Sequence, residues 1–204
     1  MKFYNFMRKS LRVLLTKLIF PTVALGDLSQ IPDGPVVLCA NHLSASDVIL
    51  LIGCTPRPIS FMAKKELFSL PFIGWLLKKM QAFPVNRGAM DVSAVKKGIA
   101  ILESGGMLGI FPQGTRCPGV DPEETYDKLH AGAMMMAHRA HAAILPVAIR
   151  TKNYKIRPFR KTELIYGAPI PYAEYAPLVE NKDYTQAVRR VFDAICALHK
   201  EPVK

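Results

Sequence analysis

The sequence predicts an α/β protein, a single sandwich-like domain with a largely parallel central sheet, preceded by an N-terminal amphipathic helix. Short apolar runs typical of buried strands alternate with longer stretches in which apolar residues have helical spacing. The chain has 204 residues, which suits one domain with its own core, and 50% of them are hydrophobic, which excludes a disordered chain. Alternation at this spacing favours parallel strands joined by helices that cover the sheet.

The expected elements follow a turn-rich connector at residues 22–35. Short apolar or β-branched runs predict strands at residues 36–40, 59–63, 81–85, 107–111, 144–149 and 163–166. Helical spacing predicts helices at residues 46–53, 71–77, 91–104, 129–142 and 183–199. We expect these elements to form one domain over residues 22–204.

Residues 1–21 are predicted to form a basic amphipathic helix that lies in a membrane interface. At about 100° per residue, an apolar face opposes a polar one, with Phe3, Met7, Leu11, Leu14 and Leu18 against Lys2, Arg8, Lys9, Arg12 and Thr16. The apolar stretch is shorter than a bilayer span, is interrupted by Lys17 and lacks a convincing signal-peptide cleavage site. The alternative is a helix docked on the protein's own core. Aromatic residues beside cations favour the membrane.

The composition narrows the class of partner. A net charge of +11 indicates an anionic partner, which could be nucleic acid, an acidic membrane or a phosphorylated substrate. We expect no nucleic-acid partner, because the chain has no recognised nucleic-acid motif and its cations are spread along the sequence. The four cysteines lack metal-ligand spacing and fit reduced thiols: Cys39, Cys54, Cys117 and Cys196.

The segment Ala40–Asp47 is the first candidate for chemistry. It joins a strand-like run to a helical run, so it is expected at the carboxyl end of a strand, where open α/β sheets bind ligands. A turn between His42 and Asp47 would let the imidazole fold back onto the carboxylate. Asp47 would then hold one ring nitrogen as N–H and leave the other free as a base. A surface ion pair or a loop-capping contact is the alternative interpretation.

Two later loops place glycine beside arginine where a predicted strand ends. Arg87 lies in Asn86-Arg87-Gly88, and the segment after strand 107–111 contains Gly114, Thr115 and Arg116. Backbone N–H groups and a guanidinium in such a loop can hold a phosphate. Each loop alone is more often a solvated charge, whereas the two loops and the His–Asp pair in this order form a specific pattern.

These blocks resemble the glycerolipid acyltransferase family over roughly residues 20–170. The family's Asn-His-x4-Asp block is matched by Asn41, His42 and Asp47. Its Phe-Pro-Glu-Gly-Thr-Arg block is matched at residues 111–116, except that Gln113 replaces the glutamate. Its arginine after a strand and its apolar proline-containing strand are matched at Arg87 and around Pro146.

The resemblance implies transfer of a fatty acyl group from an acyl-CoA or acyl-carrier-protein thioester to the free 2-hydroxyl of 1-acylglycerol 3-phosphate. His42 would be the general base and Asp47 its orienting carboxylate, with no metal and no cofactor. The acceptor's phosphate would be held by Arg87, Gly114, Thr115 and Arg116. Asn41 and Gln113 are further candidates for substrate contact. The expected setting is the cytoplasmic face of the cell membrane, with a peripheral or monotopic attachment to its phospholipid surface.

Several alternatives stay open at this point. The acceptor could be glycerol 3-phosphate or another lipid hydroxyl. A covalent route could use Ser44, Ser46 or Cys39 beside His42, although the chain has no Gly-x-Ser-x-Gly elbow. Three histidines on one predicted helix face could indicate metal: His130, His138 and His141. A non-catalytic basic membrane-binding module is the alternative from another class.

Overall fold

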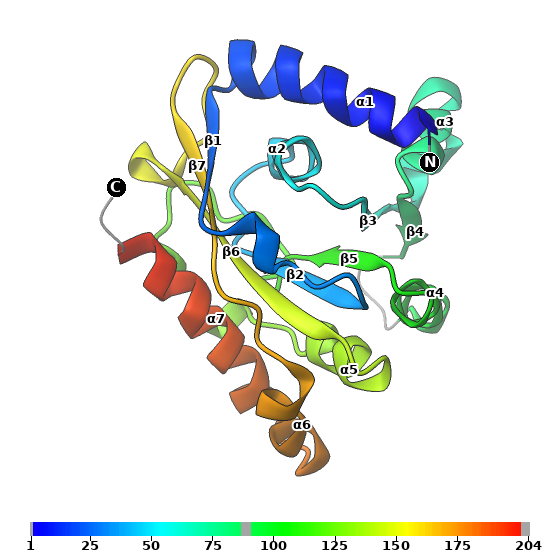
Figure 1. The fold of residues 1–204 in the computed structure, drawn as a ribbon, viewed down its shortest axis with the longest axis vertical. Helices are drawn as coiled ribbons and strands as arrows, with labels where there is room; N and C mark the ends of the chain where they lie inside the picture. Colours follow the sequence, from blue (N-terminus) through cyan, green and yellow to red (C-terminus); the bar gives the residue numbers. More distant parts are fainter. Residues whose placement is uncertain (1, 87–90, 201–204) are drawn as a thin grey trace.

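The computed structural model describes residues 2–86 and 91–200, and it contains a mostly parallel seven-stranded sheet (Figure 1). Its strand order is β1-β7-β6-β2-β5-β3-β4. The strands are β1 (Thr22–Leu25), β2 (Val36–Ala40), β3 (Ile59–Lys64), β4 (Phe83–Val85), β5 (Met107–Ile110), β6 (Ala143–Thr151) and β7 (Thr162–Tyr166). Neighbouring strands are parallel except for β6 and β7, which are antiparallel. The predicted α/β fold is therefore confirmed.

Helices cover both faces of this sheet and enclose two apolar clusters (Figure 1). One face carries α1 (Lys2–Val13), α2 (Ser46–Cys54) and α3 (Pro71–Lys79). The other carries α4 (Val92–Glu103), α5 (Gly132–Arg139), α6 (Tyr172–Glu180) and α7 (Tyr184–Lys200). The central strand β2 is buried along its whole length, and its alternate side chains enter opposite clusters. This double burial explains why residues 36–40 form a continuous apolar run.

Four segments differ from the sequence prediction. The helix predicted at 129–142 is confined to Gly132–Arg139, and the left-handed φ of 47° at His141 prevents its continuation. Strand β1 lies in the predicted connector, and α6 lies in a stretch with no predicted element. The predicted strand at 81–85 starts only at Phe83, because Gln81 adopts a left-handed φ of 61° that breaks the extended chain. Strand β1 has four residues and is held by parallel pairing with β7, a contact between segments far apart in the sequence. Local sequence pattern carries little information about such pairing.

The N-terminal helix lies across α2 and is docked on the domain (Figure 1). Tyr4 is 1% exposed, and its hydroxyl accepts a 2.8 Å hydrogen bond from the Ile59 N–H. Arg8 donates to the carbonyls of Thr55 and Pro56, each at 3.0 Å, just beyond the end of α2. A cation at this position satisfies carbonyls that a helix C-terminus leaves unpaired.

This docking corrects the predicted arrangement of faces. Arg8 and Thr16 were assigned to the polar face opposite the apolar one, yet Arg8 contacts the domain and Thr16 is 2% exposed. Two apolar side chains point outward instead, with Phe6 65% and Leu18 60% exposed. The docked alternative is therefore what the structure shows for the inner face of this helix. Among the described residues, none of the helices has both the length and the apolar character needed to cross a bilayer.

Candidate active site

His42 and Asp47 meet at the carboxyl end of β2. The loop after Ala40 turns back before α2 begins at Ser46, and it brings the His42 Nδ1 atom to 2.7 Å from Asp47 Oδ2. The two side chains are almost closed to solvent, with His42 8% and Asp47 0% exposed. The predicted fold-back is thus present. Because the pair is buried, the interpretation as a surface ion pair is excluded.

Backbone donors fix the position of the Asp47 carboxylate. Its Oδ2 atom accepts hydrogen bonds from the N–H groups of Leu43 and Ser44, at 2.7 and 2.9 Å. Asp47 also lies in the first turn of α2, where the helix dipole favours a negative charge. A carboxylate held in this way keeps Nδ1 of His42 as the donor, and Nε2 is left as the nitrogen that can take a proton.

The backbone of His42 is clamped from both sides by the segment that follows β5. Its N–H donates to Gln113 Oε1 at 2.6 Å, and its carbonyl accepts from the Cys117 N–H at 2.8 Å. The imidazole also stacks on Phe111, with ring centroids 3.9 Å apart and an interplanar angle of 11°. Sequence reasoning missed this clamp, although the block at residues 111–116 was the signal that could have found it.

Both polar atoms of the Gln113 side chain form hydrogen bonds within the protein. It is 1% exposed, and its Nε2 donates to Thr125 Oγ1 at 2.8 Å while its Oε1 holds His42. Thr125 in turn donates to the Pro122 carbonyl at 2.7 Å. The structure therefore places this candidate substrate contact as a link between the base and the 117–131 loop.

Asn41, the other candidate for a substrate contact, is also used structurally. It is 0% exposed, its Nδ2 donates to the Ile149 carbonyl at 3.1 Å, and its Oδ1 accepts from the Ile149 N–H at 2.7 Å. These two bonds join the end of β2 to β6. The amide thereby fixes the strand end from which the His42 loop departs.

The residues expected to hold phosphate lie beside the dyad and are exposed. Gly114, Thr115 and Arg116 follow β5 in an open loop, whereas Arg87 lies outside the described residues. Gly114 has a φ of +64°, and its N–H donates to the Phe111 carbonyl at 2.9 Å. Gly114 therefore makes the turn. The Thr115 N–H and the Arg116 side chain are left as the groups open to an anion.

The dyad borders a cavity of about 180 Å³. Its wall is formed by residues in or just after β2, β3, β4 and β5: His42, Phe61, Met62, Val85, Gly109, Ile110, Phe111 and Gly114. A cavity that joins an imidazole to apolar side chains suits a reacting group carried on an apolar chain. His130 was not predicted near this site, yet its ring packs so closely on Gly114 that a Cβ there would lie 2.6 Å from its Cδ2.

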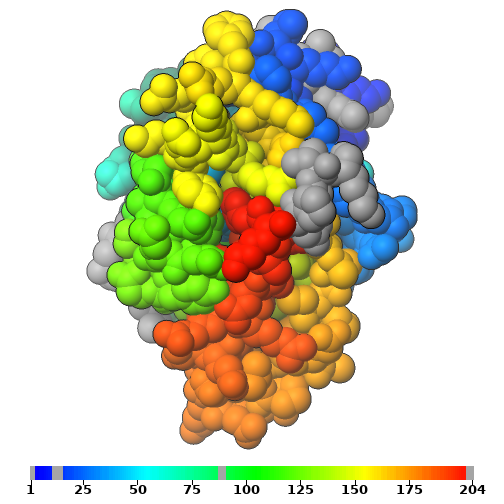
Figure 2. Space-filling view, turned by 90° about the vertical axis from the view of Figure 1, so that its left-hand side faces the viewer, coloured from blue at the N-terminus to red at the C-terminus, as the bar shows by residue number. Residues whose placement is uncertain are grey.

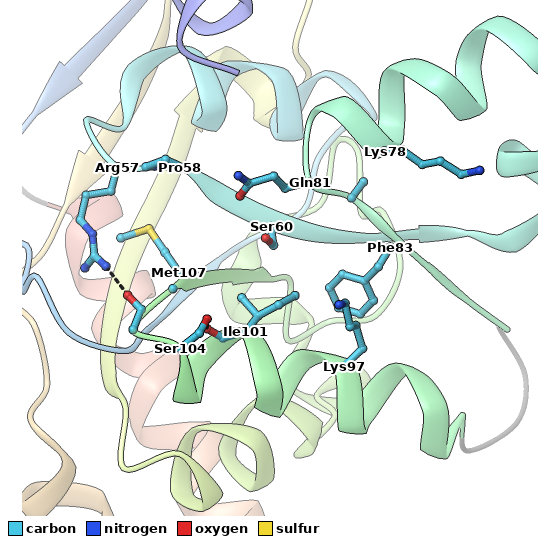
Figure 3. A pocket seen from close by; sticks show the side chains of 13 residues that line it. Arg57, Pro58, Ser60, Lys78, Gln81, Phe83, Lys97, Ile101, Ser104 and Met107 are labelled. Carbon is cyan, nitrogen blue, oxygen red and sulfur yellow. Dashed lines mark hydrogen bonds between the residues drawn. The ribbon is translucent and has the colours of Figure 1, made fainter. Parts of the chain in front are cut away.

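A larger cavity of about 590 Å³ lies elsewhere, at the amino ends of β3 and β5 (Figure 3). Its most prominent cation, Arg57, donates to the carbonyls of Gly105 and Gly34 at 2.9 and 3.0 Å. Figure 3 shows Lys78 directed away from the centre of this cavity. Because the His42–Asp47 pair lies at the opposite end of the strands, the larger cavity is separate from the candidate active site.

The geometry also bears on the covalent alternative. Cys39 is fully buried, and burial raises the pKa of its thiol to about 12, so it supplies no thiolate at neutral pH. The Ser44 hydroxyl accepts the Ser46 N–H at 3.2 Å, which is a local side-chain-to-backbone contact just before α2. The short contact of His42 is made with Asp47 rather than with a nucleophile.

The three histidines considered for metal do not gather. His130 packs on Gly114, whereas the rings of His138 and His141 lie beside Tyr172. Within the part of the chain that the structure describes, no three His, Cys, Asp or Glu side chains are grouped so that they could hold a metal ion.

Comparison with known proteins places this geometry in a family. Residues 22–150 match the family model described as acyltransferase. The chain belongs to the acyltransferase family. A relative named 1-acyl-sn-glycerol-3-phosphate acyltransferase, from Bacillus subtilis, is 35% identical over 179 residues, which is 86% of each chain. A second relative, the lyso-ornithine lipid O-acyltransferase of Pseudomonas aeruginosa, is 34% identical over 121 residues, 59% of this chain and 45% of the relative.

A solved structure shows the same fold. The crystal structure of the 1-acyl-sn-glycerophosphate acyltransferase of Thermotoga maritima has a TM-score of 0.68 and 22% identity to this chain. It covers 100% of this chain, and 80% of that protein is matched. The predicted family is therefore confirmed, and with it the prediction that the chain is an acyltransferase enzyme.

Proposed function

We propose that this enzyme transfers a fatty acyl group from a thioester to the free 2-hydroxyl of 1-acylglycerol 3-phosphate, forming phosphatidic acid and a free thiol. The observation that carries the proposal is the buried 2.7 Å contact between His42 and Asp47, beside an exposed loop that contains Arg116. The Bacillus subtilis relative named 1-acyl-sn-glycerol-3-phosphate acyltransferase, which matches 86% of this chain, supports the choice of acceptor.

The chemistry needs one base and one electrostatic support. An alcohol attacks a thioester slowly unless its proton is removed during attack, and the Nε2 atom of His42 is placed to accept that proton. Asp47 accepts the Nδ1–H bond and stabilises the imidazolium that forms. When the tetrahedral intermediate collapses, the carbon–sulfur bond breaks and the imidazolium returns its proton to the departing sulfur. General-base assistance of this kind contributes ~10²–10⁴-fold.

The acceptor's phosphate is proposed to lie at the turn after β5. The Arg116 guanidinium and the Thr115 N–H are open there, and no acidic residue occurs between Phe111 and Val120 to compete for them. Arg87, for which the sequence motif is the support, is proposed as the second cation. A charge-assisted bond between guanidinium and phosphate fixes the acceptor in both distance and orientation.

The membrane surface is proposed as the site of action, at the cytoplasmic face and without a spanning helix. Two elements present apolar side chains outward next to each other, because Phe3 of α1 contacts Trp75 of α3 with ring centroids 5.3 Å apart. On α3, Phe72 is 73% and Trp75 47% exposed. An exposed apolar patch flanked by lysines is typical of a surface that lies on a bilayer.

The deciding experiment offers purified enzyme both labelled donors, acyl-CoA and acyl-carrier protein, with a panel of acceptors. The panel contains 1-acylglycerol 3-phosphate, glycerol 3-phosphate and a lyso-ornithine lipid, and the products are separated by chromatography. We expect phosphatidic acid. The Pseudomonas aeruginosa relative makes the lyso-ornithine lipid a second candidate acceptor. If this lipid alone were acylated, it would replace 1-acylglycerol 3-phosphate as the proposed acceptor. Absence of product with every pair would leave a non-catalytic module.

A further inference from the structure

The segment between β6 and β7 is strongly basic. Residues 152–161 read Lys-Asn-Tyr-Lys-Ile-Arg-Pro-Phe-Arg-Lys, with five cations and no acidic residue. Lys161 is paired with Glu163 at 2.8 Å. The other four cations are exposed and have no ion-pair partner among the described residues: Lys152, Lys155, Arg157 and Arg160. We call residues 152–161 the basic tip.

An aromatic side chain projects from this tip. Phe159 is 78% exposed, more than any other large hydrophobic residue described. Its φ of 60° is unfavourable for a residue that carries a Cβ, and its N–H donates to the Ile19 carbonyl at 2.6 Å. A second backbone hydrogen bond joins the same two segments, from the Thr162 N–H to the Pro21 carbonyl at 2.8 Å. We call α1 and the π-helix Leu14–Ile19 that follows it the N-terminal helical segment. The contacts of the tip with the end of this segment thus fix the exposed position of Phe159.

The other side of the tip contacts the loop that leads away from the active site. The Gly119 N–H donates to the Tyr154 carbonyl at 2.8 Å, and Tyr154 Oη donates to Asp121 at 2.5 Å. Gly119 is three residues beyond Arg116. The basic tip therefore bridges the N-terminal helical segment and the loop proposed to hold the acceptor's phosphate. Figure 2 shows the tip (yellow) at the top of the molecule, beside the N-terminal segment (blue) and above residues 115–130 (green).

We propose that the basic tip binds anionic phospholipid in the membrane surface, with Arg157 and Arg160 on lipid phosphates and Phe159 in the interface. The chemistry is complementary, because unpaired cations are attracted to an anionic leaflet and an aromatic ring between them can enter the headgroup region. The tip lies next to Leu18, whose exposed side chain faces outward from the adjoining segment. Lipid therefore contacts the protein both at the basic tip and at Leu18. Because the tip is bonded to the loop after Arg116, it holds that loop close to the bilayer.

A lipid surface fits this feature better than an acidic protein does. The cations and the ring project from a tight turn, in which the Arg160 N–H donates to the Arg157 carbonyl at 3.3 Å. A projecting apex with a central aromatic ring enters a soft interface, whereas recognition of a protein generally uses a broader complementary surface. The inference rests on the proposed function only in placing the enzyme at a membrane, and lipid binding itself requires no turnover.

The test compares two charge-matched double variants of the full chain by sedimentation with vesicles. The vesicles consist of phosphatidylcholine, with or without phosphatidylglycerol, and contain no acyl donor. Arg157→Ala/Arg160→Ala should bind the anionic vesicles roughly 10–30-fold more weakly than the unaltered chain. Arg139→Ala/Arg189→Ala removes two exposed arginines, one at the end of α5 and one in the second turn of α7, and should bind nearly as the unaltered chain does. An equal loss of vesicle binding in both variants would overturn the proposal, because the binding would then depend on the net charge of the protein and not on the basic tip.

A second measurement follows Phe159 itself. The chain has a single tryptophan, Trp75, so Trp75→Phe/Phe159→Trp reports on the tip alone. Its emission should shift to shorter wavelength with anionic vesicles, and brominated lipids should quench it. Unchanged emission on vesicles that do sediment the protein would overturn insertion.

The variants also separate this inference from its rivals. Arg157→Ala/Arg160→Ala should keep its activity towards acceptor dispersed in detergent and lose activity towards acceptor in anionic vesicles. If it instead binds vesicles normally and shows a raised KM for acyl-carrier protein alone, the tip recognises an acidic protein and the lipid proposal is wrong. An enzyme inactive in every assay would refute the proposed function, while the binding results would still decide the role of the tip.

Discussion

The two halves of the candidate site are built in opposite ways. On the base side, His42, Asp47 and Gln113 are between 0% and 8% exposed, and each is held by hydrogen bonds within the protein. On the anion side, Thr115 and Arg116 are exposed and lie in an open turn. Under the proposed mechanism, the fold orders the proton-transfer group in advance and leaves the charge-pairing groups free for substrate. Orientation of a reacting group within tenths of an ångström matters more for proton transfer than for the binding of a charge.

The largest effect is expected from removing the base. His42→Ala should lower kcat by ~10²–10⁴-fold or more, because it removes the imidazole proposed to take the hydroxyl proton. The fold should persist, since His42 lies in a loop whose backbone bonds to Gln113 and Cys117 do not need the imidazole. The measurement is transfer of labelled acyl groups, alongside thermal unfolding. His141→Asn, at an exposed histidine, is the matched control. Substantial turnover by a folded His42→Ala protein would remove the general-base proposal.

Asp47→Asn should be nearly as severe. The amide oxygen can still accept from the Leu43 and Ser44 N–H groups, but it provides no charge to stabilise an imidazolium. We expect kcat to fall by roughly 10²–10⁴-fold, with a smaller change in the acceptor's KM. Steady-state kinetics across pH would separate this from a folding defect, and Asp33→Asn on the exposed connector is the control. A loss confined to KM would contradict the orienting role.

Changes on the open side should act on binding. Arg116→Ala should raise the acceptor's KM by about 10–100-fold while kcat changes little, because a charge-assisted bond of about 1.5–3 kcal/mol is lost. Arg87→Ala is predicted from the sequence to behave similarly. Arg139→Ala, an exposed arginine on α5, should leave both constants unaltered. If Arg116→Ala changed only the donor's kinetics, the phosphate site would belong to the other substrate.

The base side of the site also illustrates which features of this molecule could be predicted from the sequence. The run at residues 36–40 and the pairing of His42 with Asp47 were predictable, because double burial and a strand-to-helix turn leave local patterns. Strand β1 was not predictable, because its pairing partner is β7, far along the chain. The same reason applies to Asn41, whose amide bonds to Ile149, and to the contact of Arg8 with the end of α2.

Site residues are hardest to assign from sequence where a polar side chain has two possible kinds of partner. Asn41 and Gln113 stand in motifs for which the resemblance implies substrate contact, and their residue type alone does not say whether the amide meets a ligand or the protein. Burial decides it, and burial is a property of the assembled sheet. Within the part of the chain that the structure describes, Arg116 has no such partner; its open position agrees with the prediction, and its role in binding stays a prediction.

The smallest effect is expected at Gln113, where this chain departs from the family pattern. In Gln113→Glu, a carboxylate oxygen can still accept the His42 N–H, so the base stays in place. The donor to Thr125 is lost, and Thr125 can compensate by turning its hydroxyl from the Pro122 carbonyl to the carboxylate. The new charge lies close to the loop with Arg116. We therefore expect kcat to stay within a few-fold of the unaltered enzyme, with a modest rise in the acceptor's KM.

Gln113→Leu is the matched variant that separates geometry from charge. It is similar in size but leaves the buried His42 N–H without an acceptor, which costs about 1–3 kcal/mol and loosens the base. Its kcat should fall below that of Gln113→Glu, although it adds no charge. If Leu and Glu behaved alike in kcat, the hydrogen bond to His42 would not position the base. If Glu instead bound the phosphorylated acceptor more tightly than Gln, pairing of the carboxylate with Arg116 would outweigh its repulsion of phosphate. An inactive natural enzyme restored by Gln113→Glu would show that the charge is essential, and that the closed half of the site needs more than the geometry its hydrogen bonds supply.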